Sequence, residues 1–327
     1  MSITTRTLSP LLSSIVIPKR KLLNGIEMPL FGLGTYTMRD KLCYQAVLHA
    51  LQIGYRLIDT ASVYRNEEEV GKAIIDSGIP RKDLFITSKL KPHDHGNKAR
   101  EACLATLKRL QLSYIDLYLI HWPGVAGKNP QDPELKMIRK ETWLALVSLV
   151  NEGYIKTLGV SNYTAYHLDE FFPSSSSPSA SSSTDASTTS SSSSSSLYPL
   201  VNQFELHPLL HQQSIIDKCN EHHIQIQSYA TLARGHTDLL ANPIIQSIAT
   251  SHQLTPAQIC LRWAIQHGWS VIPKSSQIER IEENLLALSG TDLTKEEMNL
   301  IDNLEMEYLK SHPSGGLRTC WDPTTIA

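Results

Sequence analysis

Short apolar runs alternate with helix-like segments along most of the chain, and this alternation constrains the fold more than any other feature. Eight of the runs have the length and composition of buried strands. Eight strands alternating with helices over more than about 250 residues predict an α/β fold, the (β/α)8 TIM barrel. A doubly wound open sheet is the competing architecture. The predicted strands are 30–33, 56–58, 84–88, 115–120, 157–160, 200–203, 225–228 and 271–272, and the predicted helices include 99–110, 142–150, 214–221 and 256–266.

The segment before the first strand predicts a β-hairpin. The apolar run 15–17 is followed by the segment 21–28, which contains Asn24-Gly25, and Asn-Gly is a strong signal for a tight turn. Residues 1–14 lack acidic side chains and are expected to form a flexible leader. We therefore expect one barrel domain over 15–327.

A serine-rich run at 174–196 interrupts the alternation. It cannot bury apolar surface, so it is expected to be disordered. Because it follows a helical segment near 165–171 and precedes a strand, it is a helix-to-strand connection. Such connections lie at the end of a barrel away from the active site, where an insertion costs little loop entropy. We interpret the run as a tolerated low-complexity insertion rather than a lid or a recognition arm.

Composition argues against several classes of function. The formal net charge of −2 gives no general attraction to nucleic acid or to acidic membranes. No apolar run reaches the ~18 residues that a membrane span needs. The five cysteines are widely separated without a Cys-x-x-Cys pair, which favours reduced thiols in the cytosol. His93 and His95 have no supporting ligand pair, so we expect solvated histidines and no metal site.

Four polar side chains end or closely follow three consecutive predicted strands. Asp59 follows 56–58, Tyr64 lies five residues beyond it, Lys89 follows 84–88 and His121 follows 115–120. The carboxyl ends of parallel strands face the ligand site of a barrel, so these side chains are expected to meet. Each alone has an ordinary structural explanation, such as a helix cap for Asp59. Their joint placement indicates chemistry.

These four residue types suit the reduction of a carbonyl group. Hydride addition leaves an alkoxide that needs a proton, and a tyrosine with an ordinary pKa of about 10 is a poor donor near neutrality. The ammonium of Lys89 is expected to lower the pKa of Tyr64, and the carboxylate of Asp59 to keep that ammonium charged. The imidazole of His121 can hydrogen-bond to the substrate oxygen.

The stretch 54–71 resembles the first signature of the aldo-keto reductases residue for residue. The resemblance extends over about 22–323, apart from the serine-rich run. It implies that Asp59, Tyr64, Lys89 and His121 form the family's catalytic tetrad. In that tetrad the tyrosine is the general acid, the lysine and aspartate tune it, and the histidine orients the carbonyl.

The resemblance also implies NADPH/NADP+ as cofactor. Residues 272–284 resemble the family's Ile-Pro-Lys-Ser…Arg…Glu-Asn motif, whose Lys and Arg hold the 2′-phosphate. A lysine and an arginine flanking a helix start can clamp a phosphate. The chain has no GxGxxG fingerprint and no Walker A loop. The positions matched to cofactor binding are Thr35, Asp59, Ser161, Asn162, Gln203, Tyr229, Ala230, Leu232, Arg234, Lys274, Ser275, Arg280, Glu283 and Asn284.

Two departures from the family pattern bear on affinity and substrate range. The loop 228–235 reads Ser-Tyr-Ala-Thr-Leu-Ala-Arg-Gly instead of continuing Ser-Pro-Leu-Gly after Tyr, and its Arg234 could add a phosphate contact. Tyr36 stands where several relatives carry a tryptophan. The substrate pocket is expected to consist of Tyr36, His121, Trp122, the loop 123–139 and a tail at 305–327.

The sequence thus predicts a monomeric, NADPH-dependent carbonyl reductase that converts aldehydes or ketones to alcohols. Aldoses, dicarbonyls and lipid-derived aldehydes are all candidate substrates, because pocket loops vary on a constant scaffold. One alternative is a regulatory subunit of the same fold that binds the cofactor and turns over slowly. Another is a barrel lyase that uses Lys89 as a Schiff-base nucleophile.

Overall fold

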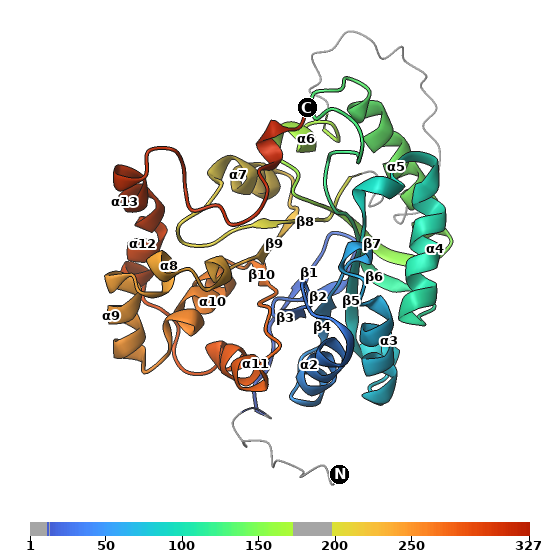
Figure 1. The fold of residues 1–327 in the computed structure, drawn as a ribbon. Coiled ribbons are helices and arrows are strands. Elements are labelled where there is room, and N and C mark those ends of the chain that lie inside the picture. The colour runs from blue at the N-terminus through green and yellow to red at the C-terminus, as the bar shows by residue number, and fades with distance from the viewer. Residues whose placement is uncertain (1–11, 13, 173–197) are drawn as a thin grey trace, which may run out of the picture.

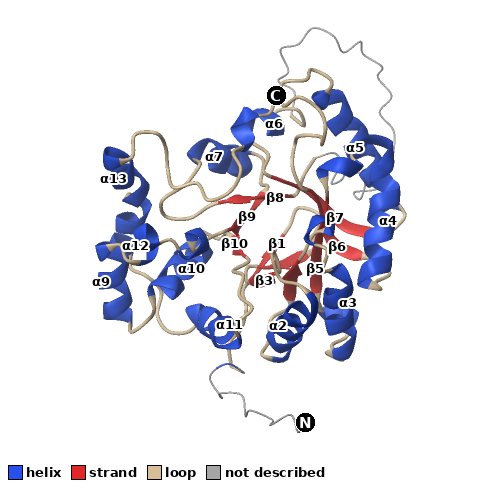
Figure 2. Ribbon diagram, viewed as in Figure 1, coloured by secondary structure: helices blue, strands red, loops and turns tan. Residues whose placement is uncertain are grey.

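The computed structural model describes residue 12, residues 14–172 and residues 198–327, and they form a ring of parallel strands with helices outside it (Figures 1 and 2). Eight strands follow one another in chain order, each parallel to its neighbour. The barrel prediction is therefore confirmed, and the open doubly wound sheet is excluded. The strands are β3 (Gly32–Gly34), β4 (Leu57–Asp59), β5 (Phe85–Leu90), β6 (Ile115–Ile120), β7 (Ile155–Ser161), β8 (Val201–Glu205), β9 (Gln225–Tyr229) and β10 (Ser270–Val271).

The first and last strands close the ring through two isolated parallel bridges. These bridges join Phe31 to Val271 and Gly34 to Lys274. A Cβ atom at Gly34 would lie 2.6 Å from the carbonyl oxygen of Ile272, which is closer than atoms can pack. Glycine at this position therefore lets the two backbones approach closely enough to complete the barrel.

The helices alternate with the strands and cover the outer face of the ring (Figure 1). Local signals define their starts, as at Thr255, where a capping box with Gln258 precedes a helix that opens on Pro256. The predicted helices at 99–110 and 256–266 are confirmed with the same bounds. The helices are α2 (Asp40–Gln52), α3 (Glu67–Asp76), α4 (Ala99–Leu110), α5 (Leu135–Asn151), α6 (Ala165–Leu168), α7 (Gln213–Glu221), α8 (Thr237–Leu240), α9 (Pro243–His252), α10 (Pro256–Gln266), α11 (Ile278–Leu285), α12 (Lys295–Asp302) and α13 (Leu304–Ser311).

Several strands extend further toward their carboxyl ends than the apolar pattern predicts. β4 includes Asp59, which pairs with Thr87, and β5 includes Lys89, which pairs with Leu119. Backbone hydrogen bonds continue through a polar residue as readily as through an apolar one, so the end of an apolar run is not the end of a strand. The polar side chains are thus held by the rigid sheet rather than by loops.

The N-terminal hairpin is present, but its first strand is not the predicted run 15–17. β1 (Lys19–Lys21) pairs in antiparallel fashion with β2 (Glu27–Pro29), with Asn24-Gly25 in the connecting turn. The run before β1 is followed by Pro18, which has no N–H for a sheet ladder. The prediction for 15–17 was therefore wrong, while the hairpin itself was right.

The hairpin fills the lower end of the barrel, which is the end where the barrel strands begin. Leu22 and Met28 are buried in one cluster with the inward-facing side chains Leu57, Phe85 and Leu117 near the amino ends of their strands. Further along the strands, the interior becomes polar. The lower half of the barrel is thus an apolar core, and polar chemistry is confined to the carboxyl end.

Two predicted segments lie largely outside the described residues. The serine-rich run 174–196 lies entirely outside them, between α6 and β8 in chain order. Of the predicted leader 1–14, the structure describes Leu12 and Ser14, and Leu12 is buried in the main hydrophobic core.

Candidate active site

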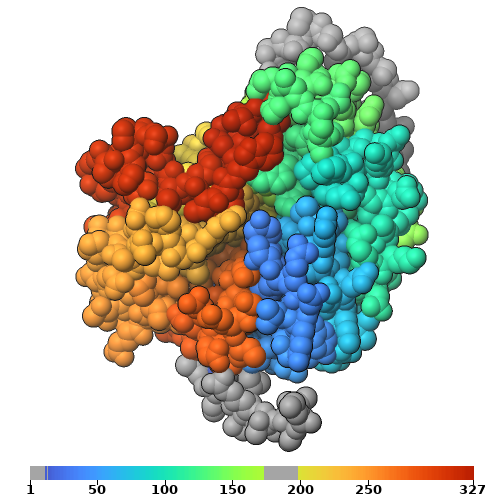
Figure 3. Space-filling view, in the orientation of Figure 1, coloured from blue at the N-terminus to red at the C-terminus, as the bar shows by residue number. Residues whose placement is uncertain are grey.

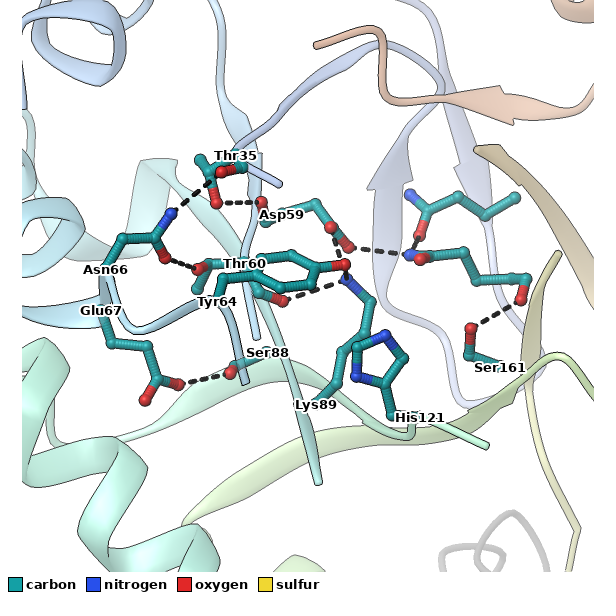
Figure 4. Close-up of polar contacts among 12 residues, drawn as sticks. Thr35, Asp59, Thr60, Tyr64, Asn66, Glu67, Ser88, Lys89, His121 and Ser161 are labelled. Carbon is teal, nitrogen blue, oxygen red and sulfur yellow. Dashed lines mark hydrogen bonds and ion pairs between the residues drawn. The ribbon is translucent and has the colours of Figure 1, made fainter. Parts of the chain in front are cut away.

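The amino group of Lys89 is the centre of the candidate site (Figure 4). The side chain projects from β5 into the ring and is fully buried. Its Nζ lies 2.5 Å from Asp59 Oδ1, 3.1 Å from the carbonyl oxygen of Thr60 and 3.3 Å from Tyr64 Oη. Three of the four predicted catalytic side chains therefore meet around one ammonium group.

A short turn after β4 positions the tyrosine. Residues Ser62–Tyr64 form one turn of 3-10 helix, and Arg65 ends it in the left-handed region of backbone space. The hydroxyl of Ser62 donates to the carbonyl oxygen of Lys89 at 3.0 Å. The turn is thus tied to the neighbouring strand, and this tie orients the phenol of Tyr64 toward the ammonium.

Asn66 connects the loops around this turn, and sequence reasoning missed it. Its Nδ2 donates to the carbonyl oxygens of Thr35 and Met38 at 2.9 and 3.0 Å. Its Oδ1 accepts a hydrogen bond from the hydroxyl of Thr60 at 2.7 Å, and the residue is fully buried. An asparagine directly before an acidic helix start was the available sequence signal.

A second buried carboxylate, Glu67, lies near the site at the start of α3 (Figure 4). Its two oxygens accept hydrogen bonds from Ser88 Oγ and from Arg109 Nε, each at 2.6 Å. Burial lowers the pKa of Lys89, and the charges of Asp59 and Glu67 oppose that shift. Both carboxylates thus favour the ammonium form.

Burial dominates the pKa values of the tetrad. Burial raises the pKa of Tyr64 well above its ordinary value, and the negative charge of Asp59 adds to this effect. Burial lowers the pKa of Lys89 and raises that of Asp59, while their mutual attraction opposes both shifts. In this structure the pKa of Tyr64 is therefore raised rather than lowered, because loss of solvent has the largest effect on it. Tyr64 is held as a neutral phenol with a proton to give.

His121 completes the tetrad and begins an aromatic wall. Its ring centroid lies 5.6 Å from that of Tyr64, with the planes at 75°. Burial and the charge of Lys89 lower the pKa of His121 well below its ordinary value, so the imidazole is neutral. Trp122 stacks beside it, and Tyr36 lies edge-on to Tyr64 with the ring centroids 5.1 Å apart. Of the predicted substrate residues, Tyr36 and His121 therefore lie against Tyr64, and Trp122 lies beside His121.

The residues matched to the nicotinamide carboxamide lie on the next strands of the ring. Ser161 Oγ donates to the backbone carbonyl of Gln203 at 2.8 Å, and Asn162 Oδ1 accepts from the hydroxyl of Tyr229 at 2.7 Å. The side-chain amide of Gln203 donates to Asp59 Oδ2 at 2.7 Å. These residues thus form one hydrogen-bonded group that adjoins the tetrad.

The residues matched to the 2′-phosphate lie where the ring closes. Lys274 follows β10, and Arg280 is in the first turn of α11. Both side chains are exposed, and neither forms an ion pair with a carboxylate of the described residues. Ser275 Oγ accepts from the backbone N–H of Gln277 at 3.0 Å and orders the turn between them. Glu283 accepts from Thr255 at 2.7 Å and joins α11 to α10.

The loop after β9 brings the remaining matched residues to the mouth of the barrel. Ala230 and Leu232 lie between Tyr229 and Arg234 in this loop. The guanidinium of Arg234 donates to Cys320 Sγ at 3.0 Å and lies 5.5 Å from the ring centroid of Tyr36. In this conformation Arg234 thus faces the aromatic wall. The other two matched residues, Thr35 and Asn284, are buried.

The C-terminal tail is tied across the barrel mouth by Glu205, another residue that sequence reasoning missed. Glu205 Oε1 accepts from the backbone N–H of Thr319 at 2.7 Å, and Oε2 accepts from that of Cys320 at 3.1 Å. Trp321 then packs on Trp122 with ring centroids 5.0 Å apart. The tail, red in the space-filling view, borders a hollow at the centre of that face (Figure 3).

The predicted substrate loop 123–139 extends too far, because Arg139 belongs to α5. Its guanidinium pairs with Glu170 at 2.5 Å and donates to the carbonyl oxygens of Pro123 and Ala327 at 3.2 and 2.7 Å. Arg139 is therefore a buried structural residue that holds the loop and the tail together.

The described part of the chain has no cluster of three or more His, Cys, Asp or Glu side chains placed to hold a metal ion. His95 is buried rather than solvated, and burial lowers its pKa to about 4. All five cysteines are free. Among the described helices, none combines the length and the apolar character that crossing a membrane requires.

Comparison with known proteins identifies the family. The model of the aldo/keto reductase family matches residues 30–306. The chain belongs to the aldo/keto reductase family. It is 39% identical over 289 residues to glyoxal reductase of Bacillus subtilis (strain 168), covering 88% of this chain and 92% of that protein.

Other relatives agree. Methylglyoxal reductase DkgA of Escherichia coli (strain K12) is 38% identical over 264 residues, covering 81% of this chain and 85% of that protein. The crystal structure of MGS-M4, an aldo-keto reductase from a Medee basin deep-sea metagenome library, superposes with a TM-score of 0.74. That enzyme is 39% identical, and the match covers 87% of this chain and 94% of its own. The protein is accordingly an oxidoreductase of the carbonyl-reducing type.

Proposed function

We propose that this aldo/keto reductase uses NADPH to reduce aldehydes and ketones to alcohols, with Tyr64 as the proton donor. The observation that carries the proposal is the position of Lys89 Nζ, between the carboxylate of Asp59 at 2.5 Å and the phenol of Tyr64 at 3.3 Å. This arrangement supplies a proton and stabilises the anion that its transfer leaves behind.

Each member of the tetrad has a separable role in the proposed reaction. When bound, the reduced cofactor supplies the hydride. His121, neutral because of its burial, can donate a hydrogen bond to the substrate carbonyl oxygen and direct it toward Tyr64. Tyr64 then transfers its proton to that oxygen, and the ammonium of Lys89 stabilises the phenolate. Asp59 favours the charged form of this buried ammonium.

The residues around the ring fit the proposed cofactor. Lys274 and Arg280 are exposed cations without a carboxylate partner in the described residues, at the N-terminal end of α11, which suits an anionic phosphate. Ser161, Asn162 and Gln203 present side-chain amides and a hydroxyl beside the tetrad, as the nicotinamide carboxamide requires. Thr35, Tyr229, Ala230, Leu232, Arg234, Ser275, Glu283 and Asn284 complete the proposed set.

Small dicarbonyls are the first substrates to test. Two of the relatives are a glyoxal reductase and a methylglyoxal reductase, and small substrates need little pocket beyond the tetrad. The aromatic wall of Tyr36, Trp122 and Trp321 also suits larger apolar aldehydes. Aldoses and lipid-derived aldehydes therefore remain in the proposed range.

A substrate panel tests the proposal. Purified protein is mixed with NADPH and, in turn, methylglyoxal, 4-nitrobenzaldehyde, an aldose and a lipid aldehyde, and the loss of NADPH absorbance is followed. We expect turnover with at least one aldehyde. Tight NADPH binding with background turnover on the whole panel would instead favour the regulatory-subunit alternative. Borohydride trapping of a substrate on Lys89 would favour the lyase.

The cellular location and the oligomeric state stay predictions. Four of the five free cysteines are buried, and this is compatible with the predicted cytosolic location. Size-exclusion chromatography with light scattering would test the predicted monomer.

A further inference from the structure

A buried row of hydrogen-bonded polar side chains, here called the relay, runs across the barrel interior from Asp59 to the hairpin. Gln203 Nε2 donates to Asp59 Oδ2 and to Gln227 Oε1, each at 2.7 Å. Gln227 Nε2 donates to Ser270 Oγ at 3.1 Å, and Ser270 Oγ donates to the carbonyl oxygen of Pro29 at 3.1 Å. The three intermediate residues lie on β8, β9 and β10, and all are buried.

The carbonyl oxygen of Pro29, at the hairpin end of this row, sets the direction of every hydrogen bond in the row. A carbonyl oxygen only accepts, so Ser270 must donate its single hydroxyl proton to Pro29. Ser270 can then only accept from its other neighbour, so Gln227 must present its NH2 group to it. The oxygen of Gln227 consequently faces Gln203, which must present its own NH2 group.

The amide of Gln203 therefore has one orientation that satisfies both of its neighbours. Its two N–H groups serve Gln227 and Asp59, which is the orientation that an ionised carboxylate requires. If the amide were reversed, its oxygen would face the oxygens of both neighbours without any proton between them. A buried network in which every polar group has a partner is rigid, whereas a partly satisfied one is costly.

We infer that Gln227 and Ser270 are positioning residues for the reaction: they orient the amide of Gln203 so that it holds Asp59 ionised against Lys89. The inference rests on the proposed function, because it assigns a role to a site whose reaction is itself proposed. Neither residue touches the reacting atoms. Their effect reaches the substrate through Gln203, Asp59 and Lys89.

Other charged groups act on the same carboxylate and must be held constant in a test. Lys89 faces Asp59 from β5, and Tyr64 faces it from the turn after β4. His121, after β6, and Glu67, on α3, act on Lys89. Within the described residues none of these groups forms a hydrogen bond or ion pair with Gln227 or Ser270, so substitutions of those two residues leave the polar contacts of these groups in place.

The pKa of Asp59 gives the inference a measurable consequence. The hydrogen bond from Gln203 lowers that pKa and opposes the effect of burial. When the amide loses its fixed orientation, the carboxylate binds a proton at higher pH, and Lys89 loses its charged partner. The acid limb of the kcat profile should then move to higher pH.

The test compares Gln227→Leu and Ser270→Ala with Ser228→Ala. Ser228 is a matched control, because it is a buried serine of β9 whose hydroxyl donates to the backbone carbonyl of Leu206 at 2.7 Å, outside the relay. For Gln227→Leu we expect the acid limb of kcat to rise by up to about one pH unit, the size of a lost hydrogen bond to a charged group. Ser270→Ala should give a smaller shift in the same direction, and Ser228→Ala should give none.

A titration of Asp59 by carboxyl-carbon NMR, in protein labelled at aspartate, separates this inference from the proposed reaction. If wild-type protein reduces no carbonyl, the proposed function fails, and the NMR midpoint of Asp59 alone decides the relay. The inference is overturned if Gln227→Leu and Ser270→Ala, both shown to be folded by circular dichroism, keep the wild-type midpoint. It is equally overturned if Ser228→Ala shifts the midpoint as much as Ser270→Ala does.

Discussion

The two ends of the candidate site differ in how much of their structure exists before any ligand arrives. Three members of the tetrad are joined by hydrogen bonds at Lys89, and all four are buried except Tyr64, which is half-buried. The proposed phosphate end consists of Lys274 and Arg280, which are exposed and lack ion pairs within the described residues. The first arrangement is preorganised for chemistry, and the second is open for binding. Substitutions at the first end should therefore change rate and stability, and those at the second should change cofactor affinity.

The largest effect is expected at the proton donor. Tyr64→Phe removes the proton that the alkoxide needs, so kcat for aldehyde reduction should fall by about 10²- to 10⁴-fold. NADPH binding, followed by fluorescence, should stay near the wild-type value. A Tyr64→Phe variant that retains most of its turnover would contradict the role proposed for Tyr64. It would also contradict the view that the tetrad is the end of the site preorganised for chemistry.

The next largest effect concerns stability. Asp59→Asn leaves the ammonium of Lys89 buried without its partner, and breaking one side of a buried ion pair costs about 3–5 kcal/mol. Lys274→Ala, at the exposed end, should change the free energy of unfolding by less than about 0.5 kcal/mol. Urea denaturation followed by circular dichroism measures both. Equal losses in the two variants would show that the ends are equally structured.

At the open end the effect should appear in affinity. Arg280→Ala should weaken NADPH binding by about 10- to 100-fold, because a charge-assisted contact to the phosphate is lost. The affinity for NADH, which has no 2′-phosphate, should change by no more than about twofold. Arg20→Ala, on β1 at the opposite end of the barrel, is the control for loss of an exposed arginine. Matching losses for the two dinucleotides would rule out a phosphate contact.

The aromatic wall should influence only substrates that reach it. The side chain of Trp321 is 54% exposed and packs on Trp122. Trp321→Ala should raise KM for 4-nitrobenzaldehyde by about 2- to 10-fold, the value of one aromatic contact. KM for methylglyoxal should stay constant. A uniform change for both aldehydes would place Trp321 outside the substrate pocket.

The smallest effect is an expected absence of change with pH. The pKa of His121 lies well below its ordinary value, so its imidazole stays neutral as the pH falls through about 6.5. The rate of aldehyde reduction should therefore show no limb near that pH. A limb near pH 6.5 that disappears in His121→Asn would show that the histidine titrates normally and is not desolvated.

The fold and the tetrad were accessible from the sequence because both depend on local patterns. The run 115–120 lies between helical segments and is followed directly by His121, so one pattern predicts both the strand and the site residue. The end of β5 was predicted too early, because Lys89 is polar and yet continues the sheet. An apolar pattern records what is buried against the core, not where backbone pairing stops.

The contacts that the sequence did not reveal join residues far apart in the chain. Glu205 binds Thr319 and Cys320, and nothing near any of them identifies the partner. Gln227 lies within the predicted strand 225–228, but nothing near it in the sequence identifies Gln203 and Ser270 as the partners of its amide. Inward positions repeat every second residue, and this period places Gln227 on the same face as Tyr229. The direction of the Tyr64 pKa also required the structure, since the extent of desolvation is a tertiary property.

The hairpin closes the barrel at the amino ends of its strands, so the candidate site is open at the carboxyl ends. Because Leu22 and Met28 fill the amino-terminal end, small molecules would reach the candidate site from the opposite end, beneath the C-terminal tail. Under the proposed function the dinucleotide and the carbonyl compound would both enter through this opening, so the one that binds deeper would bind first and leave last. An alcohol product that stays bound in this opening would therefore slow the release of NADP+.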